Sequence, residues 1–168
     1  GDSPALMTLN KENKKLYVSR MMPMGETMPG AVTPIVQEIN YEDSNQMVLS
    51  NEFELNSPSP HGLSINTDGS ELYAASFTAD WLYKIYPETG DTLSASMDPS
   101  INYIDPGIEV KRLNPIQCIS IEDSLLVISC SGRFNTNSWT GEQDTIPGQV
   151  QLWNTNTMSL KDIVQFTW

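Results

Sequence analysis

The chain has 168 residues and a formal net charge of −12, from 21 acidic and 9 basic side chains. This acidity disfavours nucleic acid as a partner, because phosphate binding needs clustered Lys and Arg. It suits a soluble surface or one that attracts a cationic partner or metal. No apolar run approaches the roughly 18 residues of a membrane-spanning helix. The chain opens at Gly1, so we expect a processed product, a trimmed piece or an interior segment of a longer protein.

Three similar hairpins recur along the chain. Each is predicted as two short strands with alternating apolar and polar residues, joined by a polar turn. The turns span residues 10–15, 66–70 and 122–124. The second strands carry Leu16, Leu72 and Leu126, a spacing near the roughly 40–50-residue period of propeller blades.

A second hairpin follows each of the first ones. The predicted outer pairs are residues 35–39 with 47–49, 81–86 with 92–95, and 150–153 with 160–166. Pro and Gly interrupt every candidate helix longer than about ten residues, so the chain is predicted to be all-β. The same strand order repeated three times favours a propeller over a sandwich or a jelly roll.

The sequence therefore predicts a β-propeller segment of three four-stranded antiparallel blades, at roughly 5–55, 60–98 and 115–168, in a single partial propeller domain. Propellers typically close with more blades than three. The missing blades could come from the same protein, from another chain or from self-association, and we favour a longer parent protein over a symmetric assembly of half-rings.

Residues 60–74 read Pro-His-Gly-Leu-Ser-Ile-Asn-Thr-Asp-Gly-Ser-Glu-Leu-Tyr-Ala, and the following hairpin has the tip Glu88-Thr89-Gly90. This unit resembles the YVTN-type repeat of bacterial propellers, whose blades run Pro, Gly, a short strand, Asp-Gly, an apolar-Tyr-Val strand and a Thr-Gly tip. Residues 15–19 match it, whereas residues 122–124 replace Asp-Gly and the third unit lacks the Tyr. Lactonase-like propellers and those of haem d1 nitrite reductases and nitrous oxide reductases are built similarly. The resemblance implies a bacterial propeller and specifies no chemistry.

The connections between the predicted strands differ in length. The long ones join second to third strands, or one blade to the next, and span residues 20–34, 51–60, 97–115 and 131–148. In this topology they share one face of the blades, here called the long-loop face, while the opposite turns are short. Binding sites concentrate on long loops carried by a rigid scaffold, so we expect the site on this face.

His61 is the only histidine, and it precedes an innermost strand near the mouth of the central channel. It could be a metal or haem ligand or an acid–base group, because His titrates near neutrality. Histidines at comparable positions are ligands in the haem and copper relatives that the sequence resembles. The alternative is a polar side chain hydrogen-bonded at a strand entrance. We assign no cofactor to this chain. A haem or copper cofactor could belong to a longer parent protein.

Two further groups of side chains suggest metals. The thioethers of Met21, Met22, Met24 and Met28 could bind Cu(I) or serve as adaptable packing, and we favour packing. Loop carboxylates could hold Ca²⁺ or act in acid–base roles, although no calcium-loop motif is present, and we favour solvated loops. These carboxylates are Asp98, Asp105, Glu109, Glu142 and Asp144. We predict no metal site in the chain.

Cys118 and Cys130 lie on the two strands of one predicted hairpin. Their numbers average to 124, near the centre of the turn, so we expect them to face each other across the ladder. They could form a cross-strand disulfide or remain two small buried residues. The spacing excludes a zinc site made of these two alone.

Arg20, Arg112 and Arg133 are the only arginines, and all map to the long-loop face, where they could grip an anionic ligand or an acidic partner. Phe134 and Trp139 beside Arg133 would suit a protein interface. No hydrolase, Walker or dinucleotide motif is present.

The sequence thus predicts an exported, periplasmic or extracellular, non-catalytic scaffold. It would bind a protein or a small ligand through the long-loop face, at His61, Arg20, Arg112, Arg133 and Trp139. The alternative is the propeller part of a redox- or metal-linked enzyme with His61 at the channel mouth.

Overall fold

The computed structural model describes residues 3–21, 33–43, 45–98, 100, 106–107, 112–122, 124–136, 140–141 and 143–166. Within these ranges the chain forms fourteen strands and no helix, so it holds no helix that could span a membrane.

Twelve of these strands form three four-stranded antiparallel sheets, here called blades 1, 2 and 3, as the sequence predicted. Blade 1 consists of β1 (Ser3–Asn10), β2 (Lys15–Met21), β3 (Ile35–Asn40) and β4 (Val48–Glu54). Blade 2 consists of β5 (Pro60–Ile65), β6 (Leu72–Ser76), β7 (Trp81–Ile85) and β8 (Thr92–Ser96). Blade 3 consists of β9 (Pro115–Ile121), β10 (Leu125–Cys130), β13 (Gln149–Asn154) and β14 (Ser159–Gln165).

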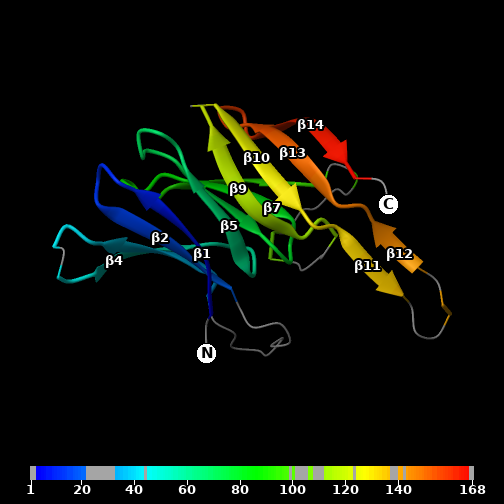
Figure 1. The fold of residues 1–168 in the computed structure, drawn as a ribbon, viewed down its shortest axis with the longest axis horizontal. Coiled ribbons are helices and arrows are strands. Elements are labelled where there is room, and N and C mark those ends of the chain that lie inside the picture. The colour runs from blue at the N-terminus through cyan, green and yellow to red at the C-terminus, as the bar shows by residue number, and fades with distance from the viewer. Residues whose placement is uncertain are drawn as a thin grey trace.

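The three blades lie side by side in chain order, from blue to red in Figure 1. Their first strands are neighbours, because β5 packs against both β1 and β9. One apolar core lies between blades 1 and 2, where Tyr17 and Val36 meet Leu72. A second lies between blades 2 and 3, where Tyr73 meets Trp153.

Burial follows the number of neighbours that each sheet has. Every residue of β6 and β7 is buried, since both faces of blade 2 pack against another blade. In β10 and β13 buried residues alternate with half-buried ones, since only one face of blade 3 is covered. The continuous burial of β6 and β7 and the alternating burial of β10 and β13 therefore reflect the positions of blades 2 and 3 in the stack.

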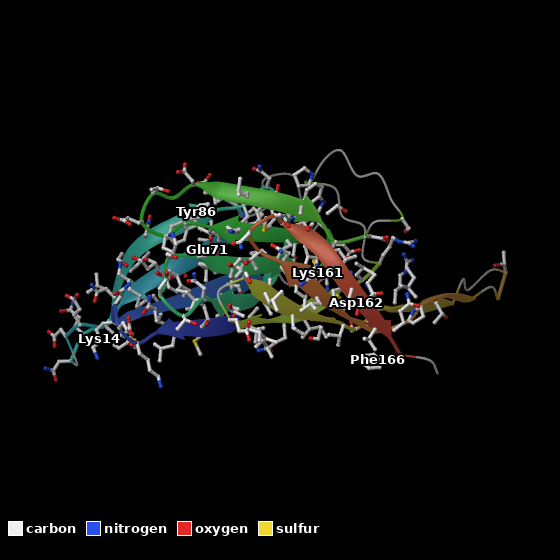
Figure 2. All side chains as sticks on the ribbon, turned by 90° about the horizontal axis from the view of Figure 1, so that it is seen from above. Lys14, Glu71, Tyr86, Lys161, Asp162 and Phe166 are labelled. Carbon is white, nitrogen blue, oxygen red and sulfur yellow. The ribbon has the colours of Figure 1, made fainter. Side chains whose placement is uncertain are left out.

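The connection between β10 and β13 contains structure that the sequence did not predict. Residues expected to form a loop make an additional hairpin of β11 (Arg133–Thr136) and β12 (Gln143–Ile146), which form a separate two-stranded sheet. The hairpin projects beyond the three blades in Figures 1 and 2.

Candidate functional site

Four of the predicted site residues lie at the same end of the blades, on the long-loop face. Arg20 is near the end of β2, His61 is near the start of β5, Arg112 precedes β9, and Arg133 opens β11. Trp139, the fifth, lies outside the described residues. The binding role of these residues stays a prediction, and their contacts are described below.

His61 connects all three blades. Its Nδ1 lies 2.8 Å from the carbonyl oxygen of Ile116 in blade 3, and its own carbonyl accepts a hydrogen bond from Ser19 Oγ in blade 1 at 2.8 Å. Its ring packs on Phe77 with the centroids 5.6 Å apart. Because a carbonyl can only accept, Nδ1 is the donor in this hydrogen bond, and Nε2 is the ring nitrogen that takes no part in it. This agrees with the sequence alternative of a hydrogen-bonded residue at a strand entrance.

The described residues offer little to a metal or haem. No group of three or more His, Cys, Asp or Glu side chains among them could hold a metal ion. His61 Nε2 is therefore one nitrogen ligand without such a cluster around it in this part of the chain.

Asp80 accepts three backbone hydrogen bonds on this face. It is fully buried and takes a left-handed backbone conformation with φ +56°. Its carboxylate accepts backbone N–H groups from Arg112 at 2.9 Å, Leu113 at 3.0 Å and Asn114 at 3.0 Å. Burial raises the pKa of Asp80, although these three hydrogen bonds act in the opposite direction. The side chain fixes the segment that leads from blade 2 into blade 3.

That segment in turn holds the base of the projecting hairpin. Leu113 O accepts the N–H of Gly132 at 2.9 Å, and Asn114 Nδ2 donates to Gly132 O at 2.8 Å. Gly132 has φ +72°, and a Cβ at this position would lie 2.2 Å from the carbonyl oxygen of Ile146. Only glycine fits such a position, so β11 leaves blade 3 from a fixed point.

Arg112 and Arg20 have carboxylate partners within the chain. Arg112 Nε lies 2.8 Å from Asp98 Oδ2, and Arg20 Nη1 lies 3.9 Å from Glu52 Oε1. Burial acts to raise the pKa of Asp98, but hydrogen bonds from Ser100 and Arg112 outweigh burial and hold this pKa below its usual value. These two arginines therefore present less positive charge than the sequence suggested.

The predicted register of the two cysteines is wrong. Cys118 faces Ile128 and Cys130 faces Pro115, and both are free, buried thiols. Ile121 pairs with Leu125, and Glu122 beside it takes a positive φ of 56°, so the pairing is centred nearer the N-terminus than expected. Burial, then the charge of Asp80, raises the pKa of Cys130 to about 12. Burial, then Cys130, raises the pKa of the Cys118 thiol far above its usual value. The structure matches the alternative of two small buried residues.

Several other predicted residues cannot be placed. Met22, Met24, Met28, Asp105, Glu109 and Glu142 lie outside the described residues, as do the side chains of Met21, Phe134 and Asp144. The interpretations attached to them remain predictions.

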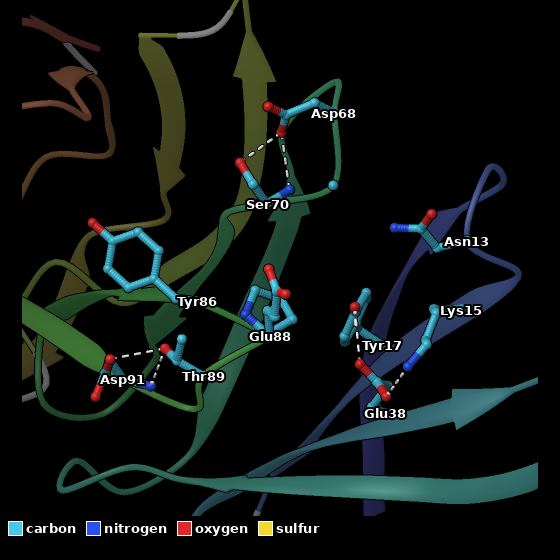
Figure 3. A pocket seen from close by; sticks show the side chains of 12 residues that line it. Asn13, Lys15, Tyr17, Glu38, Asp68, Ser70, Tyr86, Glu88, Thr89 and Asp91 are labelled. Atoms are coloured by element: carbon cyan, nitrogen blue, oxygen red, sulfur yellow. Dashed lines mark hydrogen bonds and ion pairs between the residues drawn. The ribbon is translucent and has the colours of Figure 1, made fainter.

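A cleft of roughly 750 Å³ lies on the opposite, short-turn face, between blades 1 and 2 (Figure 3). Its floor holds Glu38, which is buried and bonds to Lys15 Nζ at 2.5 Å, Tyr17 Oη at 3.1 Å and Ser50 Oγ at 2.8 Å. Burial, then the charge of Glu38, raises the pKa of Tyr17 far above its usual value.

The walls of this cleft are two turns of blade 2. One contains Asp68, whose carboxylate accepts from the N–H and Oγ of Ser70 at 2.9 and 2.6 Å. The other spans residues 86–91 and includes Tyr86 and Glu88. The sequence did not predict this cleft, because the cleft forms only where two blades meet. Its one sequence signal is the charged Lys15 and the aromatic Tyr17 on either side of Leu16.

No protein-family model and no curated protein sequence matches this chain. Two solved structures are similar to it in fold. A nidogen/laminin complex matches with a TM-score of 0.59 and 12% identity, covering 96% of this chain and 47% of that one. A luciferin-regenerating enzyme matches with a TM-score of 0.62 and 12% identity, covering 98% of this chain and 46% of that one.

The matches place this chain in the class of all-β proteins with a propeller-like fold. The chain spans less than half the length of each structure it matches. The resemblance to the YVTN repeat remains an expectation.

Proposed function

We propose that this chain is a non-catalytic, propeller-type scaffold that binds a protein partner through its long-loop face. The observation that supports this proposal is the projecting hairpin β11–β12, anchored at Gly132. Scaffolds of this kind place binding residues on elements that a rigid core positions.

The hairpin has the geometry of a strand-addition site. β11 pairs with β12 alone in the described sheets, so each strand keeps one edge without a strand beside it. An open edge can take up an extended segment of a partner through main-chain hydrogen bonds. The fold admits assembly with another protein, as one matched structure is a nidogen/laminin complex. The other is an enzyme, so the fold alone does not decide the function.

Export to the periplasm or the extracellular space belongs to the same proposal. Its support is the composition, in which charged residues make up 18% of the chain, below the roughly 25% of an average soluble domain. Fractionation of cells that produce the parent protein would test it, and recovery in the cytosol alone would contradict it.

The experiment for binding compares three immobilised proteins as bait for a lysate and culture medium of the source cells. These are the wild type, a variant with residues 133–146 replaced by a short Gly-Ser linker, and the control Glu88→Gln on the short-turn face. A partner identified by mass spectrometry would then be purified, and its affinity measured for each bait. We expect binding to the wild type and the control, and at least tenfold weaker binding to the linker variant. No partner, or equal affinity for all three, would contradict the proposal.

A second candidate function is the propeller part of a redox- or metal-linked enzyme. One contact of His61 supports it. Metal-binding histidines usually donate their other ring N–H to a carbonyl or a carboxylate, and His61 Nδ1 faces Ile116 O in this way. Titration of the chain with haem and with Cu²⁺, for wild type and His61→Ala, would test this candidate. A spectral change that His61→Ala abolishes would support it, and identical titrations would exclude a role for His61.

A further inference from the structure

Each of the two outer faces of the blade stack carries a group of apolar side chains. On blade 3, the register and the burial of Leu126 and Trp153 against blade 2 put the alternate residues on the opposite face. We call this surface the C-terminal end face. It carries Ile119, Ile121, Leu125, Val127, Val150, Leu152 and Val164. Ile119 and Val164 are 53% and 58% exposed. Antiparallel sheets that face water normally carry polar residues on the exposed face. The apolar residues here are instead typical of a face that packs against another protein surface.

Blade 1 has the matching surface at the other end of the stack. Its register places Leu9, Leu16, Ile39 and Leu49 in one row across four strands, on the face turned away from blade 2. We call this surface the N-terminal end face. Leu49 is 52% exposed, and a shallow hollow of roughly 630 Å³ beside the row is lined by Met7, Leu16, Ile39 and Met47 among others.

The equivalent row in blade 2 shows what such a surface packs against. Leu72 pairs with Ile85 as Leu16 pairs with Ile39, yet Leu72 and Ile85 are fully buried because blade 1 covers them. The chain thus contains two interfaces, 1–2 and 2–3, in which the later face of one blade packs on the earlier face of the next. The two end faces are the unpaired halves of a third such interface.

We infer that the occupant of each end face is a second copy of this chain. The C-terminal end face of one copy would pack on the N-terminal end face of the other, and the reciprocal contact would close a ring with two-fold symmetry. Size supports this partner, because the chain covers 47% and 46% of the two matched structures, so two copies supply almost one complete structure of that size. A second copy also covers both faces at once, using the packing already present twice in the chain.

The test is the oligomeric state of the 168-residue chain, measured by light scattering after size exclusion over a concentration series. We expect a dimer with twice the chain mass of 18.7 kDa. Leu49→Lys and Val164→Lys each add a charge to one end face, and each variant alone should be monomeric. Mixed together they should form dimers again, because one of the two interfaces in the mixed pair is unaltered. Leu93→Lys, at a 49% exposed site on β8 away from both end faces, is the control that should remain dimeric.

Circular dichroism would establish that each variant folds, as expected for substitutions at half-exposed positions. A wild-type monomer or a series of open-ended oligomers would overturn the inference. So would a dimer that Val164→Lys leaves intact, since that result would mean that two copies of the N-terminal end face pair with each other.

Discussion

The carboxylate of Asp80, between β6 and β7 of blade 2, accepts the backbone N–H of Leu113 at 3.0 Å, in the segment that leads into blade 3. The same carboxylate also accepts the N–H groups of Arg112 and Asn114. One buried side chain of blade 2 therefore sets where blade 3 begins, and through Gly132 it also sets where the projecting hairpin begins.

Replacing Asp80 should destabilise the fold strongly. Asp80→Ala leaves three N–H donors without this acceptor, so we expect the free energy of unfolding to fall by about 3 kcal/mol or more, since each unpaired buried donor costs about 1–3 kcal/mol. Asp80→Asn keeps one acceptor oxygen and tolerates the left-handed backbone, so its loss should be smaller. Urea unfolding followed by tryptophan fluorescence measures both. A loss for Asn as large as that for Ala would contradict the hydrogen-bond explanation.

Two glycines with similar backbone conformations allow the cost of left-handed backbone strain to be distinguished from the cost of a steric clash. Gly132 and Gly90 have φ +72° and +80°, but a Cβ at Gly90 would meet nothing within 4 Å. Gly90→Ala should cost about 1–2 kcal/mol, the strain of a left-handed residue. Gly132→Ala should cost more, and should also accelerate amide hydrogen exchange in β11 and β12. Equal losses for both variants would show that the contact with Ile146 O is relieved without cost.

The blades could be predicted from the sequence because their signals are local. Alternating apolar residues and polar turns, such as the one that holds Gly69 at φ +77°, lie within a few residues of each other. The contacts of Asp80 could not be predicted, since its three partners are backbone N–H groups more than thirty residues away. Such donors leave no residue-type signature.

Two other errors have equally specific causes. The cysteine register shifted because one positive φ, at Glu122, moved the centre of the turn. The β11–β12 hairpin was missed because Arg-Phe-Asn-Thr and Gln-Asp-Thr-Ile lack the alternation of a half-buried strand. Of the candidate site, the long-loop position of the arginines could be derived from strand order. Their carboxylate partners could not, because side-chain pairing depends on how the loops fold back.

Blades 1 and 2 contain the same ion pair with the charges exchanged. Tyr17 faces Glu38, which binds Lys15, and Tyr73 faces Lys84, which lies 2.8 Å from Glu71. The Lys84 side chain is 3% exposed and that of Lys15 is 29% exposed.

Lys84→Met should therefore lower the free energy of unfolding by about 3–5 kcal/mol, the cost of breaking a buried pair. Lys15→Met leaves the Glu38 carboxylate, which is 5% exposed, with only the hydroxyl donors of Tyr17 and Ser50, so its loss should be of similar size. Adding Glu71→Gln to Lys84→Met should restore part of the loss, because it removes the unpaired charge. Urea unfolding measures all three variants. A loss below about 1 kcal/mol for either lysine variant, the range of a pair at the surface, would contradict the role assigned to burial.

The two thiols should be hidden in the folded protein and available after unfolding. Because burial raises their pKa values, to about 12 for Cys130, neither should react with a thiol-specific chromophoric disulfide at mildly alkaline pH. Unfolding in guanidinium without reductant should release two thiols per chain, and Cys118→Ser should release one. No released thiol in the wild type would instead reveal a disulfide between Cys118 and Cys130.

Asp98 should make stability depend on pH in the acid range. Its folded pKa lies below the usual 3.8, so the unfolded chain binds more protons between the two values and stability falls as pH decreases through this window. At neutral pH, Asp98→Asn should lower the free energy of unfolding by about 1–2 kcal/mol, because the hydrogen bonds from Ser100 and Arg112 lose a charged acceptor. Below about pH 4 that difference should shrink, since Asp98 is protonated first in the unfolded chain and then, below its lowered pKa, in the folded chain as well. Ser100→Ala, which keeps the carboxylate and removes one donor side chain, should show a smaller change in the same direction. Urea unfolding at several pH values from neutral to acid measures these differences. If the difference between wild type and Asp98→Asn stays constant over that range, the contact with Arg112 does not depend on the charge of Asp98.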